Sequence, residues 1–114
     1  IKFEKEFVRQ CRYKGVYGKE LDEPLEITAI YYMPTRRRVD LTNLLEATDD
    51  ALQKAKVIVD DSYKIVCSHD GSRVLFDKDN PRTEITIKSY VPDISKYIAV
   101  KEKQKRYMPL NYPQ

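Results

Sequence analysis

The pattern of apolar residues predicts an α+β fold, with a mixed β-sheet of about four strands and helices packed mainly on one face. Apolar residues recur at helical spacing in two segments, 2–14 and 40–55, and they alternate with period two in the segments between and after. The resulting order of helix, strand, helix and then further strands is typical of α+β folds. A chain of 114 residues is large enough for one hydrophobic core, so residues 1–114 are expected to form a single domain.

The first predicted helix covers residues 2–14. Phe3, Phe7 and Cys11 recur every four residues and form one apolar face. Acidic residues lie in its first turn and basic residues in its last, which complements the helix dipole, and a glycine follows as a stop signal. The chain begins at Ile1 rather than at a methionine, directly in this helical pattern, so we expect a short native segment before it.

A central strand is predicted over residues 25–33. Apolar residues alternate from Leu25 to Met33, and a proline bounds the run at each end. The second face of this strand carries Ile30 and Tyr32 and is therefore not very polar. A strand with two weakly polar faces is expected inside the sheet rather than at its edge.

The second predicted helix begins near Asp40, because aspartate is a preferred N-cap residue. Asp49 and Asp50 fall in the middle of this helix, where both are expected to face solvent. Thr48 interrupts the apolar stripe. The stripe consists of Leu41, Leu44, Leu45, Leu52 and Ala55.

Three further strands are predicted after the second helix, over residues 63–68, 73–76 and 84–91. Asp70-Gly71 is expected to form a hairpin turn between the first two of these strands. A short helix is expected to start at Asp93. Lysines are frequent after that position, so residues 93–114 are interpreted as a basic C-terminal extension.

Charge is distributed unevenly along the chain. Residues 40–61 carry six acids against two lysines, a net charge of −4, so the remainder of a chain with a net charge of +3 carries +7. A basic body around an acidic centre is typical of a protein that binds a polyanion and carries out metal chemistry on it. The alternative is a chance fluctuation of surface charge.

Composition excludes several classes of protein. No apolar run approaches the roughly 20 residues that a membrane helix needs. Cys11 and Cys67 alone do not make a disulfide framework and no signal peptide is visible, so a reducing, intracellular setting is expected. His69, the single histidine, lacks partners at zinc-site spacing, and three glycines provide no phosphate-binding loop. We interpret His69 as a polar residue at a strand end or as a phosphate contact.

Arginines and carboxylates gather between residues 33 and 61. The arginine triplet 36–38 precedes Asp40, and the doublet Asp60-Asp61 closes the segment. Arginines neutralise DNA phosphates, and carboxylate oxygens hold the Mg²⁺ or Mn²⁺ ions that assist phosphodiester hydrolysis. The pattern therefore predicts a metal-dependent nuclease.

Each of these aspartates also has a purely structural interpretation. Asp40 is explained fully by a helix cap. The doublet Asp60-Asp61 fits a turn before a strand, and Asp70 fits a hairpin residue beside a glycine. The sequence pattern leaves both interpretations open.

The central segment resembles a known family. Met33 to Ala55 reads MPTRRRVDLTNLLEATDDALQKA, and a short apolar run and Asp60-Asp61 follow. This pattern is similar to that of the RusA endodeoxyribonucleases, which are Holliday junction resolvases of phages and prophages. The similarity covers residues 32–66 closely and the last predicted strand more loosely.

The resemblance implies a RusA-like nuclease domain that works as a homodimer on four-way DNA junctions. Such a dimer nicks two opposed strands with Mg²⁺ or Mn²⁺ and needs no small-molecule cofactor and no membrane. It also implies a phage- or prophage-encoded protein in the cytoplasm of a bacterial host.

The resemblance further implies roles for individual residues. Asp40 and Asp61 match the family's essential aspartates, with Asp60 beside the second, and Asn43 matches its asparagine. These three aspartates are the expected catalytic residues. The expected metal ligands are Asp40, Asp60, Asp61 and, as a further ligand from outside the motif, Asp70. The expected DNA contacts are Arg36, Arg37, Arg38 and Arg73, and the expected supporting residues are Asn43 and Glu46.

Two positions depart from the family pattern. The family's second aspartate is Thr42 here, and its catalytic lysine is Glu46. Three explanations remain open. In the first, Asp60 or Asp70 supplies the missing carboxylate ligand, and Glu46 acts through a water. In the second, an arginine or a residue before Ile1 replaces the lysine. In the third, the protein binds branched DNA with weak or no cleavage. A general nuclease acting on flaps or replication forks is a further alternative.

Overall fold

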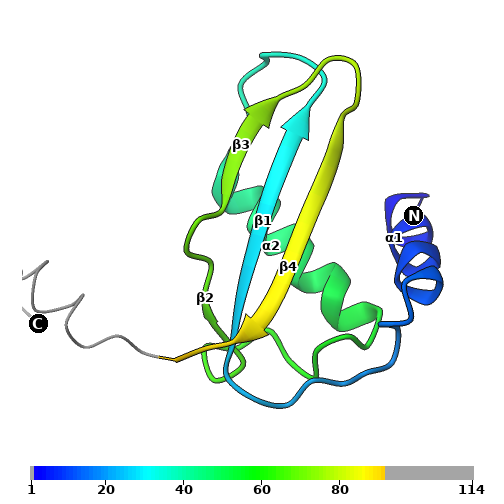
Figure 1. Ribbon diagram of the computed structural model, residues 1–114, viewed down its shortest axis with the longest axis vertical. Helices are drawn as coiled ribbons and strands as arrows, with labels where there is room; N and C mark the ends of the chain where they lie inside the picture. Colours follow the sequence, from blue (N-terminus) through cyan, green and yellow to red (C-terminus); the bar gives the residue numbers. More distant parts are fainter. Residues whose placement is uncertain (1, 92–114) are drawn as a thin grey trace, which may run out of the picture.

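The computed structural model describes residues 2–91, with side chains from Lys5 onward, and it has the predicted α+β architecture (Figure 1). Two helices and a four-stranded sheet follow one another in the predicted order. The elements are α1 Lys2–Tyr13, β1 Leu25–Met33, α2 Leu41–Lys54, β2 Val66–Ser68, β3 Arg73–Phe76 and β4 Arg82–Ser89. The helix expected at Asp93 and the extension 93–114 lie outside the described residues.

Strand β1 is the centre of the sheet, as predicted. It pairs antiparallel with β4 along nearly its whole length, from Leu25 opposite Ser89 to Tyr32 opposite Arg82. Its other edge carries β2 and then β3, both parallel to β1. Figure 1 shows β2 and β3 following each other on the same side of β1, with β4 on the opposite side. The sheet is therefore mixed, as expected.

The predicted hairpin at Asp70-Gly71 is wrong. A turn is present there, but β2 and β3 run in the same direction along one edge of β1, so the chain does not reverse between them. The strand predicted over 63–68 is also too long, because residues 62–65 form a turn in which Val66 N donates to Ser62 O at 2.8 Å.

The hydrophobic core lies between the sheet and α2. Alternate residues of β1 are almost completely buried, from Leu25, which is 1% exposed, to Tyr31, which is 4% exposed. Leu52 of α2 and the C-cap residue Ala55 pack in the same cluster, together with Cys11 of α1. Figure 1 shows α2 crossing behind the sheet and α1 beside β4, so the core cluster faces the helices.

Thr48 interrupts the apolar stripe of α2 because it binds a polar group in the core. Its hydroxyl lies 2.6 Å from the Tyr31 hydroxyl, and the Tyr31 hydroxyl also donates to the Leu44 carbonyl at 3.0 Å. Buried hydroxyl groups are costly unless they are hydrogen-bonded. The threonine and tyrosine therefore satisfy each other and attach α2 to the centre of the sheet.

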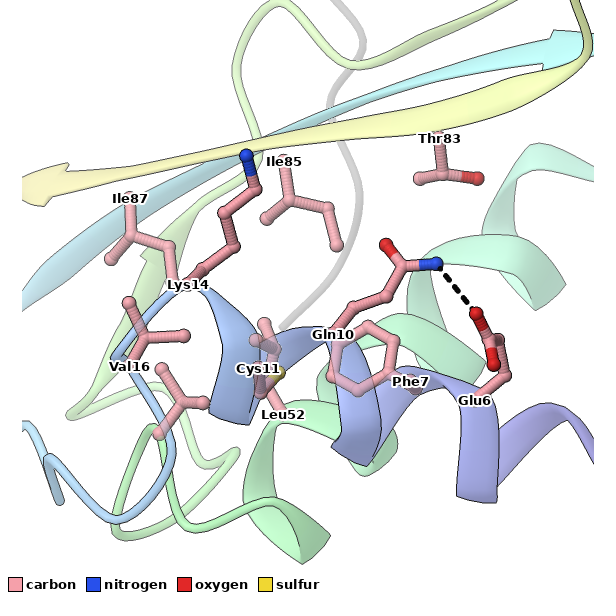
Figure 2. A pocket seen from close by; sticks show the side chains of 11 residues that line it. Glu6, Phe7, Gln10, Cys11, Lys14, Val16, Leu52, Thr83, Ile85 and Ile87 are labelled. Carbon is pink, nitrogen blue, oxygen red and sulfur yellow. Dashed lines mark hydrogen bonds between the residues drawn. The ribbon is translucent and has the colours of Figure 1, made fainter.

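A cleft of about 590 Å³ separates α1 from β4 (Figure 2). Its apolar walls come from α1, α2 and β4, and polar side chains of α1 lie at its rim. It is lined by Phe7, Cys11, Leu52, Ile85 and Ile87 together with Glu6, Gln10, Lys14, Val16, Val57 and Thr83. None of the residues predicted to carry chemistry lies in this cleft. Among residues 2–91, no helix has the length and apolar character to cross a membrane.

Candidate nucleic-acid and metal site

Asp40 caps the N-terminus of α2, as predicted. Its backbone is extended, with φ −102° and ψ 113°, and its carboxylate Oδ1 accepts a hydrogen bond from Thr42 N at 3.0 Å. A carboxylate offers about four lone-pair directions on two oxygens, and the cap uses one of them. Because Asp40 is exposed, capping leaves it able to bind a cation as well.

The arginine triplet 36–38 occupies the exposed loop between β1 and α2. The guanidinium of Arg36 lies over the ring of Phe76 at the end of β3, 4.3 Å from the ring centroid. Arg73 begins β3, is exposed, and donates from Nε to the Gly71 carbonyl at 3.1 Å. The predicted phosphate contacts are therefore all exposed, and they belong to the loop and the strand that flank the end of β1.

The other predicted aspartates are exposed residues outside the helices and strands. Asp60 and Asp61 follow the turn after α2, where the Asp60 carboxylate accepts a hydrogen bond from Asp61 N at 2.9 Å. Asp70 lies between β2 and β3, and its carbonyl accepts from the Thr28 hydroxyl at 2.8 Å. A turn therefore holds Asp70, although it is not the predicted hairpin, whereas Asp60 and Asp61 lie in the irregular segment before the turn at residues 62–65.

Asn43 and Glu46 are exposed residues of the first half of α2. They follow the cap residue Asp40 on the same helix. Glu46 thus places a negative charge where the family resemblance expects a lysine. A negative group repels phosphate, so Glu46 does not replace a phosphate-binding lysine.

No three His, Cys, Asp or Glu side chains among the described residues are arranged to hold a metal ion. The four predicted ligands therefore do not form one preformed cage. Mg²⁺ is commonly held by one or two carboxylates plus substrate phosphates and water rather than by an all-protein cage. Asp40 and Asp61 are both exposed, so the carboxylate of each is accessible to a cation.

Asp49 is the residue for which the sequence prediction is wrong. It was expected to face solvent, but its side chain is 14% exposed and its Oδ2 lies 2.7 Å from His69 Nε2. The other ring nitrogen, Nδ1, lies 2.8 Å from the Ile27 carbonyl of β1. A carbonyl only accepts hydrogen bonds, so Nδ1 carries a proton and donates it. The Nε2 contact then needs a second proton, carried either by the imidazole or by the Asp49 carboxyl.

Burial raises the pKa of the Asp49 carboxyl. The hydrogen bond from His69 opposes that rise, and the negative charge of Asp61 adds to it. Asp61 therefore lies within electrostatic reach of the middle of α2. The second oxygen of Asp49, Oδ1, is buried and has no hydrogen-bond partner.

One sequence signal for the burial of Asp49 was available. Asp49 follows Leu45 by four positions and precedes Leu52 by three, so it lies at the margin of the apolar stripe. His69, by contrast, could not have been assigned as its partner from local sequence. The turn between β2 and β3 brings His69 to α2, and that turn was predicted as a hairpin.

These features define a small α+β domain whose arginine triplet follows the end of the central strand β1. Its exposed carboxylates lie at the start of α2 and in the segments that precede β2 and β3. The family model of the endodeoxyribonuclease RusA matches residues 3–88. The chain belongs to the RusA endodeoxyribonuclease family, which confirms the family predicted from the central segment. None of the curated proteins matches the chain.

Proposed function

We propose that the protein is a metal-dependent, structure-specific endodeoxyribonuclease that resolves four-way DNA junctions by paired, symmetric nicks. The match of the RusA family model carries this proposal, because residues 3–88 include all the candidate site residues. The exposure of Asp40, Asp61 and the arginine triplet 36–38 supports it, since groups that bind DNA and a shared cation must be accessible.

In this proposal the arginine triplet 36–38 and Arg73 bind phosphates and hold the strand beside the carboxylates. Asp40 and Asp61 hold Mg²⁺ or Mn²⁺, and Asp60 and Asp70 assist. When bound, such an ion polarises water and the phosphodiester for hydrolysis. The cap keeps the Asp40 carboxylate in place, because its bond to Thr42 N restricts rotation of the side chain.

A homodimer is part of the proposal. A four-way junction has approximate two-fold symmetry, and a two-fold dimer presents two identical sites to it. Paired nicks in opposed strands then follow from the symmetry, whereas one isolated site would only nick one strand. The proposed setting is the cytoplasm of a bacterial host, with the protein encoded by a phage or prophage.

The test compares a four-way junction with a linear duplex of the same sequence, each with Mg²⁺ or with EDTA. Paired symmetric nicks in the junction alone, and only with Mg²⁺, are expected. The variant Asp40→Asn separates the two roles of this residue, because asparagine caps a helix as well as aspartate does but carries no charge. It is expected to bind the junction and to leave it uncut. Equal cutting of the linear duplex would instead point to a general nuclease.

A second candidate function is branched-DNA binding with weak or no cleavage. The observations that favour it are Thr42 and Glu46 at the positions of a family aspartate and lysine, and the absence of a preformed carboxylate cluster among residues 2–91. Tight binding of the junction without nicks in Mg²⁺ or Mn²⁺ would select this function. The same assay therefore decides between the two candidates.

A further inference from the structure

Three arginines lie over aromatic rings within the described residues. Arg12 lies 4.4 Å from the centroid of Tyr17, Arg36 lies 4.3 Å from Phe76, and Arg82 lies 3.8 Å from Tyr32. The ring quadrupole attracts the cation without serving as a conventional hydrogen-bond acceptor. The five N–H donors of each guanidinium can therefore still bind another group, unless the protein already occupies them.

Three of the five donors of Arg82 are already used by the protein. Its Nε binds Glu84, and its Nη1 binds Asp77 and the carbonyl of Asn80, each at 2.9 Å. Two carboxylates also neutralise its charge. Arg82 thus stabilises the turn between β3 and β4, and its two carboxylate partners reduce its attraction for a phosphate.

The donors of Arg36 are not used in this way. Within residues 2–91 its guanidinium makes the ring contact with Phe76 and neither a hydrogen bond nor a salt bridge. Arg36 is exposed and stands first in the arginine triplet 36–38, four positions before the cap residue Asp40. Phe76 is 41% exposed, so its ring lies at the surface, where the Arg36 side chain contacts it.

We propose that Phe76 is a positioning residue for DNA binding, which holds the Arg36 guanidinium over its ring so that the donors of Arg36 meet a phosphate beside Asp40. The inference rests on the proposed function, because it assigns the bound anion to the DNA backbone. An arginine loses rotamer freedom when it binds a phosphate. A ring that already restricts the side chain reduces this loss, and the affinity rises without any contact between Phe76 and DNA.

Position in the sheet supports this assignment. Phe76 pairs with Met33, the last residue of β1, so the end of β3 lies against the point where the chain enters the arginine loop. The Arg12–Tyr17 pair belongs to α1 and the loop after it, and Figure 1 shows α1 on the β4 side of the sheet, away from β3. Tyr17, at 36% exposed, is therefore a matched control.

The test measures affinity for a four-way junction by fluorescence anisotropy, in EDTA and over a series of salt concentrations. Arg36→Ala is expected to weaken binding and to reduce the slope of log K against log salt by about 0.9, the contribution of one phosphate contact. Phe76→Leu is expected to weaken binding about threefold to tenfold and to reduce the slope in the same direction. Phe76→Tyr restores the wild-type values, and Tyr17→Leu leaves them unchanged.

The double variant Arg36→Ala/Phe76→Leu is expected to bind no more weakly than Arg36→Ala, because Phe76 acts only through Arg36. Independent, additive losses would overturn the inference. So would wild-type affinity and slope in Phe76→Leu while Arg36→Ala is weakened. A wild-type protein that binds no DNA would overturn the proposed function itself.

A second variant covers the case in which Phe76→Leu does not fold, as judged by circular dichroism. Arg36→Lys keeps the charge but loses the planar group that lies over the ring and the fixed fork of donors. It is expected to weaken junction binding about as much as Phe76→Leu would. Wild-type affinity in Arg36→Lys would show that the ring contact plays no part in DNA binding.

Discussion

The middle of α2 and its N-terminal end use the same residue types for different purposes. In the middle, Asp49 is largely buried and bonded to His69, which also binds the Ile27 carbonyl of β1. At the N-terminal end, Asp40 is exposed and its carboxylate caps the helix beside the arginine triplet 36–38. The first arrangement connects two elements of the fold, whereas the second leaves charged groups accessible.

Burial rather than residue type decides which purpose a carboxylate serves. Asp49 and Asp50 are neighbours in sequence, but a helix rotates by about 100° per residue, so they face different surroundings. The Asp49 side chain is 14% exposed and bonded to His69, whereas the Asp50 side chain is 54% exposed and forms an ion pair with Lys54 at 3.1 Å. A buried carboxylate must be paired within the protein, and an exposed one remains able to bind a ligand.

The largest expected effect comes from the accessible carboxylates. Asp61→Asn is expected to slow junction cleavage about 100- to 1000-fold, because it removes a charge that the proposed metal ion needs. Binding measured in EDTA should stay within about twofold of wild type. The urea midpoint serves as the control, since an exposed residue outside the helices and strands contributes little to stability. If this variant nicks the junction at the wild-type rate, Asp61 is not part of the catalytic site.

The buried pair should instead affect stability. His69→Ala removes the donor to Ile27 and leaves the Asp49 carboxylate largely buried without its partner, so we expect a loss of about 2–3 kcal/mol in the free energy of unfolding. Urea denaturation measures this loss. Asp50→Ala is the matched control, and it should cost no more than about 0.5 kcal/mol because its ion pair is exposed. Equal losses in the two variants would contradict the difference between Asp49 and Asp50.

The pH dependence of stability sharpens the same comparison. The pKa of Asp49 is raised in the folded protein above its ordinary value of 3.8, so the folded state holds this proton more tightly than the unfolded chain does. The resulting contribution to stability is fully present at pH values below 3.8, and it is lost as the pH rises through the raised pKa of the folded protein. The asparagine in Asp49→Asn does not titrate, so this variant does not lose stability in this way as the pH rises.

The melting temperature of Asp49→Asn relative to wild type should therefore increase with pH, by no more than about 5 °C. Melting curves from about pH 3 to about pH 7 measure this difference. The control is Asp50→Asn, which changes an exposed carboxylate of the same helix. A flat difference for Asp49→Asn would show that burial of this carboxyl has no consequence for stability.

The smallest expected effect concerns the charge at Glu46. Glu46→Lys replaces a group that repels phosphate by one that attracts it, so junction affinity should rise about threefold and its salt dependence should steepen by up to about 0.9. Anisotropy in EDTA measures both quantities. Lys54→Glu, at the C-terminal end of the same helix, is the control for non-specific attraction. Unchanged affinity in Glu46→Lys would place this position outside the DNA-binding surface.

Local signals predicted the elements that carry the exposed site. The bounds of β1, Leu25–Met33, agree with the prediction because prolines at both ends stop the strand. The Asp40 cap was predicted because the capping bond joins residues two apart. Residues 62–65 were predicted as strand on their alternation, but they form a turn, after which the Ile65 carbonyl accepts a hydrogen bond from Leu25 N. That bond depends on a distant element, which local alternation does not report.

The sequence by itself determined the family, the α+β order of elements and the surroundings of Asp40, since each depends on neighbouring residues or on a fixed motif. The tertiary structure decided which charged side chains are buried and paired within the protein and which are exposed. The parallel placement of β2 and β3 brings His69 to Asp49, 20 positions away in the chain, and it also brings Phe76 to Arg36. Such pairs follow from strand pairing along β1, and strand pairing is a property of the assembled sheet rather than of either segment.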